Sequence, residues 1–122
     1  MARILLAEDD AATRDFVKRS LQNDAHEVVT ATEGAEALAV LTADGRGFDL
    51  LITDYQMPAM DGLSLAEKAA KVRPGLPILL MSAFTIDRGQ LAQAAANIVG
   101  LVAKPFTLEQ IRAQTKLALR AG

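Results

Sequence analysis

The chain has no cysteine, and it has a single histidine in 122 residues. Without cysteine there can be no disulfide framework and no thiolate metal site, and His26 alone cannot build a histidine-cluster zinc site. The net charge is only -2, so we do not expect the broad basic face of a nucleic-acid-binding domain. No apolar run approaches the length of a membrane span, and the apolar stretch near the amino terminus is too short for a signal peptide. We therefore expect a cytoplasmic domain that binds neither membrane nor nucleic acid.

The composition is that of a folded globular protein. Apolar residues make up 51% of the chain and charged residues 23%, which separates it from disordered sequences. Its length fits one domain, and no linker, repeat or low-complexity tract divides it. We therefore treat residues 1–122 as one domain.

Two kinds of segment alternate along the chain. Short apolar runs, which suit strands buried on both faces, occur at Ile4–Ala7, Val28–Val29, Phe48–Thr53, Ile78–Met81 and Ile98–Val102. Longer segments with helical apolar spacing or good helix formers follow them, at Ala12–Gln22, Gly34–Ala43, Leu63–Val72, Leu91–Ala96 and Leu108–Leu119. This alternation predicts an α/β fold with a parallel sheet and right-handed crossovers.

Polar residues follow four of the five predicted strands. Glu8-Asp9-Asp10 come after the first, Asp54 after the third, Ser82 after the fourth and Lys104 after the fifth. In open α/β sheets, sites form beyond the carboxyl ends of the strands, so we expect these groups to converge. Clustered carboxylates repel one another unless a divalent cation or a lysine neutralises them. Because an aspartate can act as a nucleophile toward phosphorus, these residues indicate a Mg²⁺-dependent phosphoaspartate site.

Four motifs in this order resemble those of response regulator receiver domains of the chemotaxis-regulator type. They are Ile4 to Asp10, Thr53 to Gly62, Met81-Ser82-Ala83 and Lys104-Pro105-Phe106. The resemblance covers essentially the whole chain. It implies a doubly wound (βα)5 flavodoxin-like fold with a five-stranded parallel sheet in the order 2-1-3-4-5.

The resemblance also implies a role for each residue of the site. Asp54 is the phosphoacceptor, Ser82 supplies the switch hydroxyl, and Lys104 contacts the phosphoryl group through a loop whose Lys104–Pro105 peptide is cis. Glu8 and Asp9 form the acidic pair, with Asp9 as the direct Mg²⁺ ligand, and the backbone carbonyl of Gln56 supplies another metal oxygen.

Two positions depart from the family pattern. Many members carry an aromatic residue that swings inward on phosphorylation, where this chain has Leu101. Leucine cannot exchange a polar ring tip between water and core, so we expect an altered signalling change. Phe84, two residues after Ser82, lies where the family tunes attack of water on the phosphoaspartate, and we expect it to lengthen the signal.

The expected function is phosphorelay signalling. A sensor histidine kinase or a histidine phosphotransfer protein would phosphorylate Asp54, and the face of the fourth helix, fifth strand and fifth helix would then bind an unknown downstream protein. The domain would catalyse only its own phosphorylation and dephosphorylation, as a monomer or as a dimer formed on phosphorylation. It would be a single-domain regulator or a receiver from a longer protein.

Three other readings remain open. A hydrolase of the haloacid-dehalogenase type would need a second aspartate where Gln56 stands. A flavin-binding domain would need a phosphate loop after the first strand, where Glu8-Asp9-Asp10 would repel a phosphate. A receiver that is never phosphorylated would not need the intact set of acidic, hydroxyl and lysine residues.

Overall fold

The computed structural model describes residues 2–44, 47–83 and 97–121. Five parallel strands form one sheet in the order β2-β1-β3-β4-β5, as predicted. The strands are β1 (Arg3–Ala7), β2 (Glu27–Ala31), β3 (Leu50–Asp54), β4 (Ile78–Ser82) and β5 (Ile98–Ala103). The helices are α1 (Ala11–Gln22), α2 (Gly34–Asp44), α3 (Gly62–Val72) and α5 (Leu108–Ala121). The helix predicted at 91–96 lies outside the described residues.

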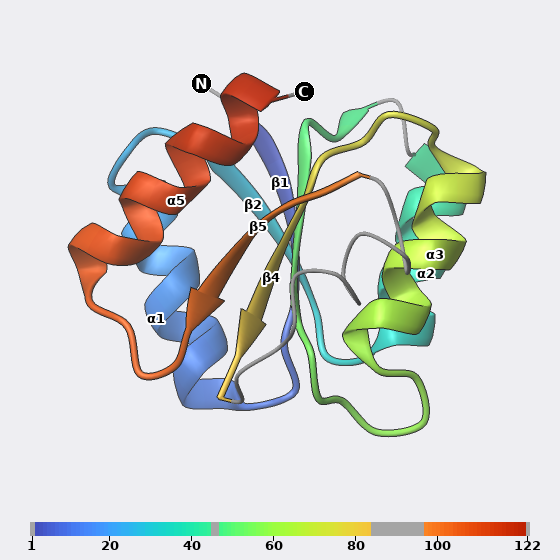
Figure 1. The fold of residues 1–122 in the computed structure, drawn as a ribbon, viewed down its shortest axis with the longest axis horizontal. Helices are drawn as coiled ribbons and strands as arrows, with labels where there is room; N and C mark the ends of the chain where they lie inside the picture. Colours follow the sequence, from blue (N-terminus) through green and yellow to red (C-terminus); the bar gives the residue numbers. More distant parts are fainter. Residues whose placement is uncertain (1, 45–46, 84–96, 122) are drawn as a thin grey trace.

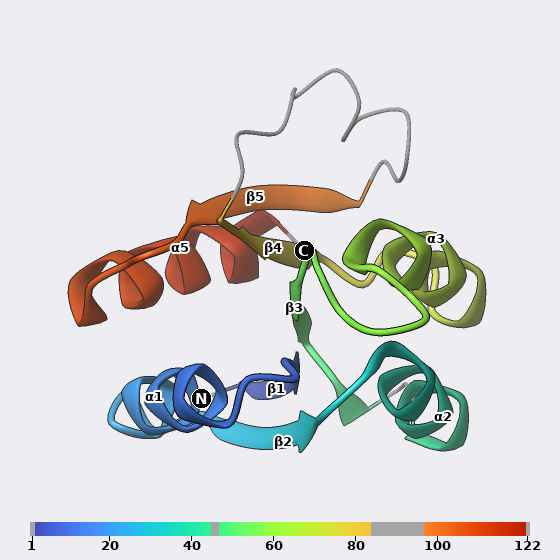
Figure 2. The same ribbon diagram turned by 90° about the horizontal axis from the view of Figure 1, so that it is seen from below.

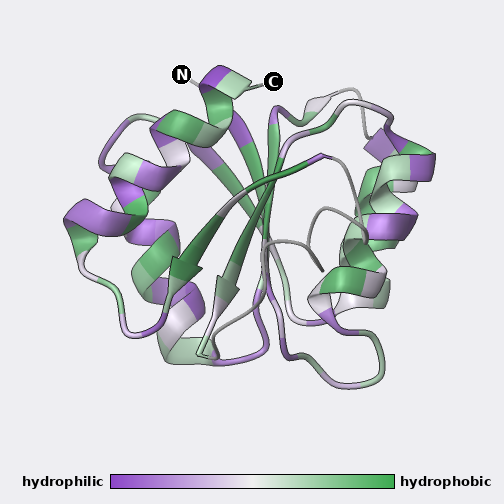
Figure 3. Cartoon of the chain, viewed as in Figure 1, coloured by the Kyte–Doolittle hydropathy of each residue, from purple (hydrophilic) through white to green (hydrophobic). Residues whose placement is uncertain are grey.

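The sheet lies between two layers of helices. Helices α1 and α5 cover one face, and α2 and α3 cover the other (Figures 1 and 2). Side chains alternate between the faces of a strand: Leu5 packs in the core beneath α2 and α3, whereas its neighbours Ile4 and Leu6 pack in the core beneath α1 and α5. Burial on both faces explains why the central strands are apolar until the polar residues at their carboxyl ends (Figure 3).

Three helices begin at residues that cap their free N–H groups. The Asp10 carboxylate accepts the N–H of Thr13, and the Asp61 carboxylate accepts the N–H of Ser64. Thr107 and Gln110 bond each other reciprocally at the start of α5, as in a capping box. Side chains of Asp10, Asp61 and Thr107 thus cap the starts of α1, α3 and α5.

Two expectations from the sequence need correction. Phe48 belongs to the core but precedes β3, which begins at Leu50, just after the Asp49 carboxylate that accepts the N–H of Arg3. Phe16 fits the apolar spacing of α1 but is 42% exposed, with its ring 6.2 Å from that of Phe106. His26, before β2, is half-buried, and its Nδ1 accepts the N–H of Ala2.

Among the described residues, no helix has the length and apolar character needed to cross a membrane.

Candidate functional site

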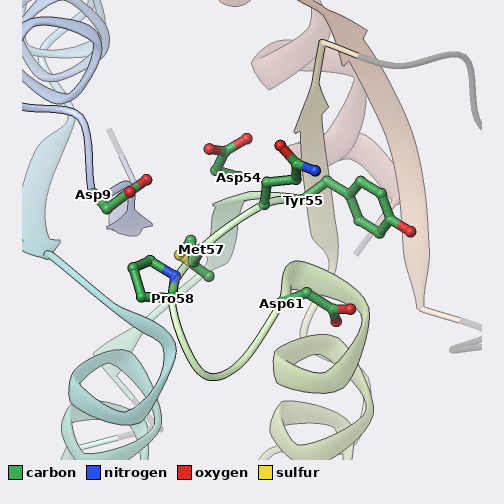
Figure 4. Close-up of a pocket in the computed structure, with 7 residues that line it drawn as sticks. Asp9, Asp54, Tyr55, Met57, Pro58 and Asp61 are labelled. Atoms are coloured by element: carbon green, nitrogen blue, oxygen red, sulfur yellow. The ribbon is translucent and has the colours of Figure 1, made fainter.

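Three carboxylates meet at the carboxyl edge of the sheet. Glu8 and Asp9 follow β1, and Asp54 is the last residue of β3, which pairs with β1. Each residue offers a carboxylate oxygen, and these oxygens lie within 4.8 Å of one another. Figure 4 shows Asp9 and Asp54 reaching this edge from different strand ends. The predicted convergence of the acidic residues is therefore confirmed.

Lys104 neutralises part of this charge from the loop after β5. Its Nζ lies 2.7 Å from Oε1 of Glu8 and 3.1 Å from Oδ1 of Asp54. Burial works to lower the pKa of Lys104, but the hydrogen bonds and charges of Glu8 and Asp54 outweigh it, so its pKa is raised. Lys104 is therefore a permanent cation between two acids. The Lys104–Pro105 peptide is cis, as the resemblance implied.

Glu8 is fully buried, and both of its oxygens have partners within the protein. Oε1 accepts from Lys104 and Oε2 accepts the N–H of Asp10 at 3.1 Å. Burial raises the pKa of Glu8 to about 7, against the lowering effect of the Lys104 bond. Glu8 therefore acts as a buried anchor for Lys104 and for the turn after β1, and it does not face the opening of the site.

An open hollow of about 610 Å³ lies over Asp9 and Asp54. Asp54 forms its floor and is 7% exposed, while Asp9 stands at its rim. The rest of its lining comes from the loop after β3: Tyr55, Gln56, Met57, Pro58 and Asp61. The Tyr55 ring points away from the two carboxylates (Figure 4), so it does not block the access of a ligand to Asp54.

Backbone contacts hold the loop after β3. The N–H of Tyr55 donates to the carbonyl of Met81 in β4, and the N–H of Gly62 donates to the carbonyl of Tyr55 at 2.7 Å. A Cβ at Gly62 would lie 2.4 Å from the Asp54 carbonyl oxygen. Only glycine lets the start of α3 approach the end of β3 this closely.

Ser82 ends β4, the strand between Asp54 and Lys104. Met81 is the register partner of Asp54, and the Ser82 carbonyl accepts the N–H of Lys104 at 2.8 Å. Ser82 is 1% exposed and does not line the hollow. The structure thus brings Glu8, Asp9, Asp54 and Lys104 together, puts Gln56 in the wall of the hollow, and places Ser82 on the adjacent strand end.

Sequence reasoning missed one residue at this edge. The guanidinium of Arg14, from the first turns of α1, donates through one nitrogen to the carbonyls of Glu8 at 3.0 Å and Asp9 at 3.5 Å. Its spacing on α1 is also that of an ordinary solvent-facing arginine, so no signal in the sequence indicates this contact.

The donor set fits a hard divalent cation. Asp9 and Asp54 present carboxylate oxygens to an open hollow, and Mg²⁺ prefers one or two carboxylates together with water. No cysteine or histidine accompanies them among the described residues, which disfavours softer metals.

The chain belongs to the response regulator receiver domain family, whose model matches residues 4–116. It is 34% identical over 118 residues to the response regulator MprA of Mycobacterium avium, covering 97% of this chain and 51% of that protein. The chain thus spans about half the length of the curated relatives it matches.

Solved receiver structures share the whole fold. The chemotaxis protein CheY4 of Vibrio cholerae superposes with a TM-score of 0.87 at 30% identity, covering 97% of this chain and 98% of that one. The response regulator TrrA of Thermotoga maritima, in complex with Mg²⁺-BeF, gives a TM-score of 0.82 at 31% identity, with 95% and 97% covered. The chain is thus a receiver domain of two-component signalling, with the flavodoxin-like architecture that the motifs implied.

Of the two departures from the family pattern, only one lies in the described part of the chain. Leu101 is a partly buried residue of β5, paired with Leu80 of β4. Phe84 lies outside the described residues, so its effect on the lifetime of the phosphorylated form stays a prediction.

Proposed function

We propose that this domain is a switch operated by Mg²⁺-dependent phosphorylation of Asp54. The observation that carries the proposal is the position of the Asp54 carboxylate, on the floor of an open hollow, 3.1 Å from the Lys104 ammonium and beside Asp9. A nucleophilic carboxylate must be accessible and must have cations ready to balance incoming phosphoryl charge. Asp54 meets both requirements.

The phosphoryl step can be written from the residues of the site. An oxygen of Asp54 attacks the phosphorus of a phosphohistidine, the P–O bond forms, and the P–N bond breaks. The donor imidazole keeps the bonding electron pair and takes up a proton from solvent. Lys104 offsets the negative charge that arrives on the phosphoryl oxygens, and the Ser82 hydroxyl is our candidate donor to one of them.

Asp9, Asp54 and the Gln56 backbone carbonyl would hold the metal, and Glu8 would support it as a nearby charge. Bound Mg²⁺ would supply charge neutralisation between carboxylate and phosphoryl oxygens. We assign Asp9 rather than Glu8 as the direct metal ligand because of the contacts that the two side chains make. Both Glu8 oxygens are already bonded within the protein, whereas the Asp9 carboxylate faces the hollow.

The phosphoryl donor in this proposal is a sensor histidine kinase or a histidine phosphotransfer protein, and the output is contact with a downstream protein in the cytoplasm. The domain would catalyse only its own phosphorylation and dephosphorylation. Phosphorylation would shift a pre-existing equilibrium that includes the face formed by β5 and α5. Leu101, in β5, would alter how that shift is transmitted.

The test is the intact mass of the protein after incubation with Mg²⁺ and acetyl phosphate. Wild type should gain one phosphoryl group, and it should not do so when the metal is chelated. Asp54→Asn should gain none. Asp49→Asn is the matched control, because it is the same isosteric substitution at the opposite end of β3. There the Asp49 carboxylate accepts the N–H of Arg3.

A phosphoryl gain in Asp54→Asn would show that another residue is the acceptor. No gain in wild type, from acetyl phosphate or from a panel of phosphorylated histidine phosphotransfer proteins, would favour a receiver that is not phosphorylated.

A further inference from the structure

We propose that Arg14 is a positioning residue for the metal site, and that it holds the turn after β1 so that the Asp9 carboxylate faces Asp54. This inference rests on the proposed function, because it concerns the same Mg²⁺ site. It begins from a contact on the backbone. One guanidinium nitrogen of Arg14 lies 3.0 Å from the Glu8 carbonyl oxygen and 3.5 Å from that of Asp9.

The other acids of the turn are anchored through their side chains. Glu8 bonds Lys104 and the N–H of Asp10, and Asp10 bonds the N–H and the hydroxyl of Thr13. Asp54 is paired with Lys104. Asp9 differs: within the described part of the chain, its carboxylate has no hydrogen-bond or ion-pair partner. Its direction is therefore set by the backbone to which it is attached.

Arg14 is the side chain that fixes this backbone from the helix side. Its own N–H bonds the Asp10 carbonyl in the first turn of α1, while its side chain reaches back to the two preceding carbonyls. The residue thus ties the helix start to the peptide units on both sides of the Asp9 Cα. Hydrogen-bonded supports of metal ligands typically contribute about 10- to 100-fold to metal affinity.

Charge and positioning predict effects of opposite sign. A guanidinium near three acids repels an incoming cation, so its removal should strengthen Mg²⁺ binding if Arg14 acts only as a charge. Loss of a support for Asp9 should weaken binding. The sign of the change in affinity therefore separates the two roles.

The experiment is a calorimetric Mg²⁺ titration of the full chain at fixed ionic strength. We expect Arg14→Met, which keeps most of the aliphatic stem, to weaken Mg²⁺ binding about 10-fold. Arg14→Lys keeps the charge, but its ammonium sits one bond closer to the backbone than the guanidinium nitrogen that makes both contacts. We therefore expect a loss of about 3-fold. Arg19→Met is the matched control, because Arg19 lies on the same helix and its side chain pairs with exposed Asp15. Its affinity should stay within about 2-fold of wild type.

Unchanged or tighter binding in Arg14→Met would overturn the proposal, as would an equal loss in Arg19→Met. If a urea titration without metal shows that Arg14→Met does not fold, Arg14→Lys alone decides, since it keeps the charge of wild type. A loss of Mg²⁺ affinity in Arg14→Lys would support the positioning role, and wild-type affinity would refute it. No Mg²⁺ binding in wild type would instead refute the metal site itself, which is a separate failure.

Discussion

Replacement of Gly62 by alanine should be costly, because the first residue of α3 touches the backbone at the end of β3. A Cβ built there lies 2.4 Å from the Asp54 carbonyl oxygen and 2.9 Å from the Tyr55 Cα. Neither atom can move without moving the strand end. Overpacking of this kind costs roughly 1–3 kcal/mol, and a backbone obstacle places it near the upper limit. The alanine recovers about 0.4–1 kcal/mol from the unfolded chain, so we expect a net loss of about 2 kcal/mol.

Gly34 provides a matched control. It is also the first residue of a helix, α2, but its added Cβ would meet the flexible side chain of Met60 at 2.9–3.1 Å. The unfolded-state gain is the same for both substitutions, so the difference between Gly62→Ala and Gly34→Ala isolates the contact with the Asp54 carbonyl. We expect Gly34→Ala to lie within about 1 kcal/mol of wild type. Urea unfolding at 25 °C should give a midpoint for Gly62→Ala about 1 M lower.

The same substitution should impair the site. Displacement of the Asp54 carbonyl shifts the carboxylate relative to Lys104, so phosphorylation by acetyl phosphate should slow in Gly62→Ala and persist in Gly34→Ala. Equal unfolding midpoints for the two variants would refute the reasoning, since they would show that the close approach at Gly62 is easily relaxed.

Three further predictions concern pH, backbone strain and metal. His26, the single histidine, should have a pKa below its usual value of about 6.5, because burial lowers it. Between the pKa values of His26 in the folded and unfolded states, the unfolded chain binds more protons. The free energy of unfolding should therefore fall as pH drops below about 6.5. An NMR titration checks the pKa, and a midpoint above 6.5 would contradict it. Ala25 has φ 65°, so Ala25→Gly should add about 0.5–1 kcal/mol to the free energy of unfolding. Ala113→Gly, at an exposed position of α5, should subtract about 1 kcal/mol. Changes of the same sign in the two variants would count against backbone strain at Ala25. Mg²⁺ at ten times its dissociation constant should stabilise wild type by about 1.4 kcal/mol and Asp9→Asn much less, which thermal melts with and without the metal would test.

The sheet was predictable because its central strands are buried on both faces. Leu5 and Ile52 pack against opposite helical layers, so apolar residues occupy successive positions of these strands and the runs stand out in the sequence. The edges were less clear. Strand β2 is longer than its apolar pair Val28–Val29, since this edge strand tolerates an exposed Glu27 and a half-buried Thr30. Phe16 shows the same limit on α1, because helical spacing marks a face without telling how completely that face is covered.

The members of the site were predictable from chain order, but their individual roles were not. Any polar residue after a parallel strand reaches the same edge of the sheet, which is why Glu8, Asp54 and Lys104 could be grouped before their contacts were known. Glu8 is buried with both oxygens bonded. This depends on how far below the surface the end of β1 lies and on how far the Lys104 side chain extends across the sheet. Neither quantity leaves a pattern in the sequence.

Arg14 shows the same limit for a residue that lies outside the motifs. An arginine in the first turns of an amphipathic helix ordinarily faces water, and nothing in its spacing separates that role from a bond to the preceding turn. The distinction arises because the chain reverses between β1 and α1, which brings the Glu8 and Asp9 carbonyls back over the helix start. Contacts of this kind join a side chain to backbone rather than to another side chain, so they place no demand on the partner residue's identity. Residues that act on a site through the backbone must therefore be found in the structure, even in a family whose ligating residues can be assigned from motifs.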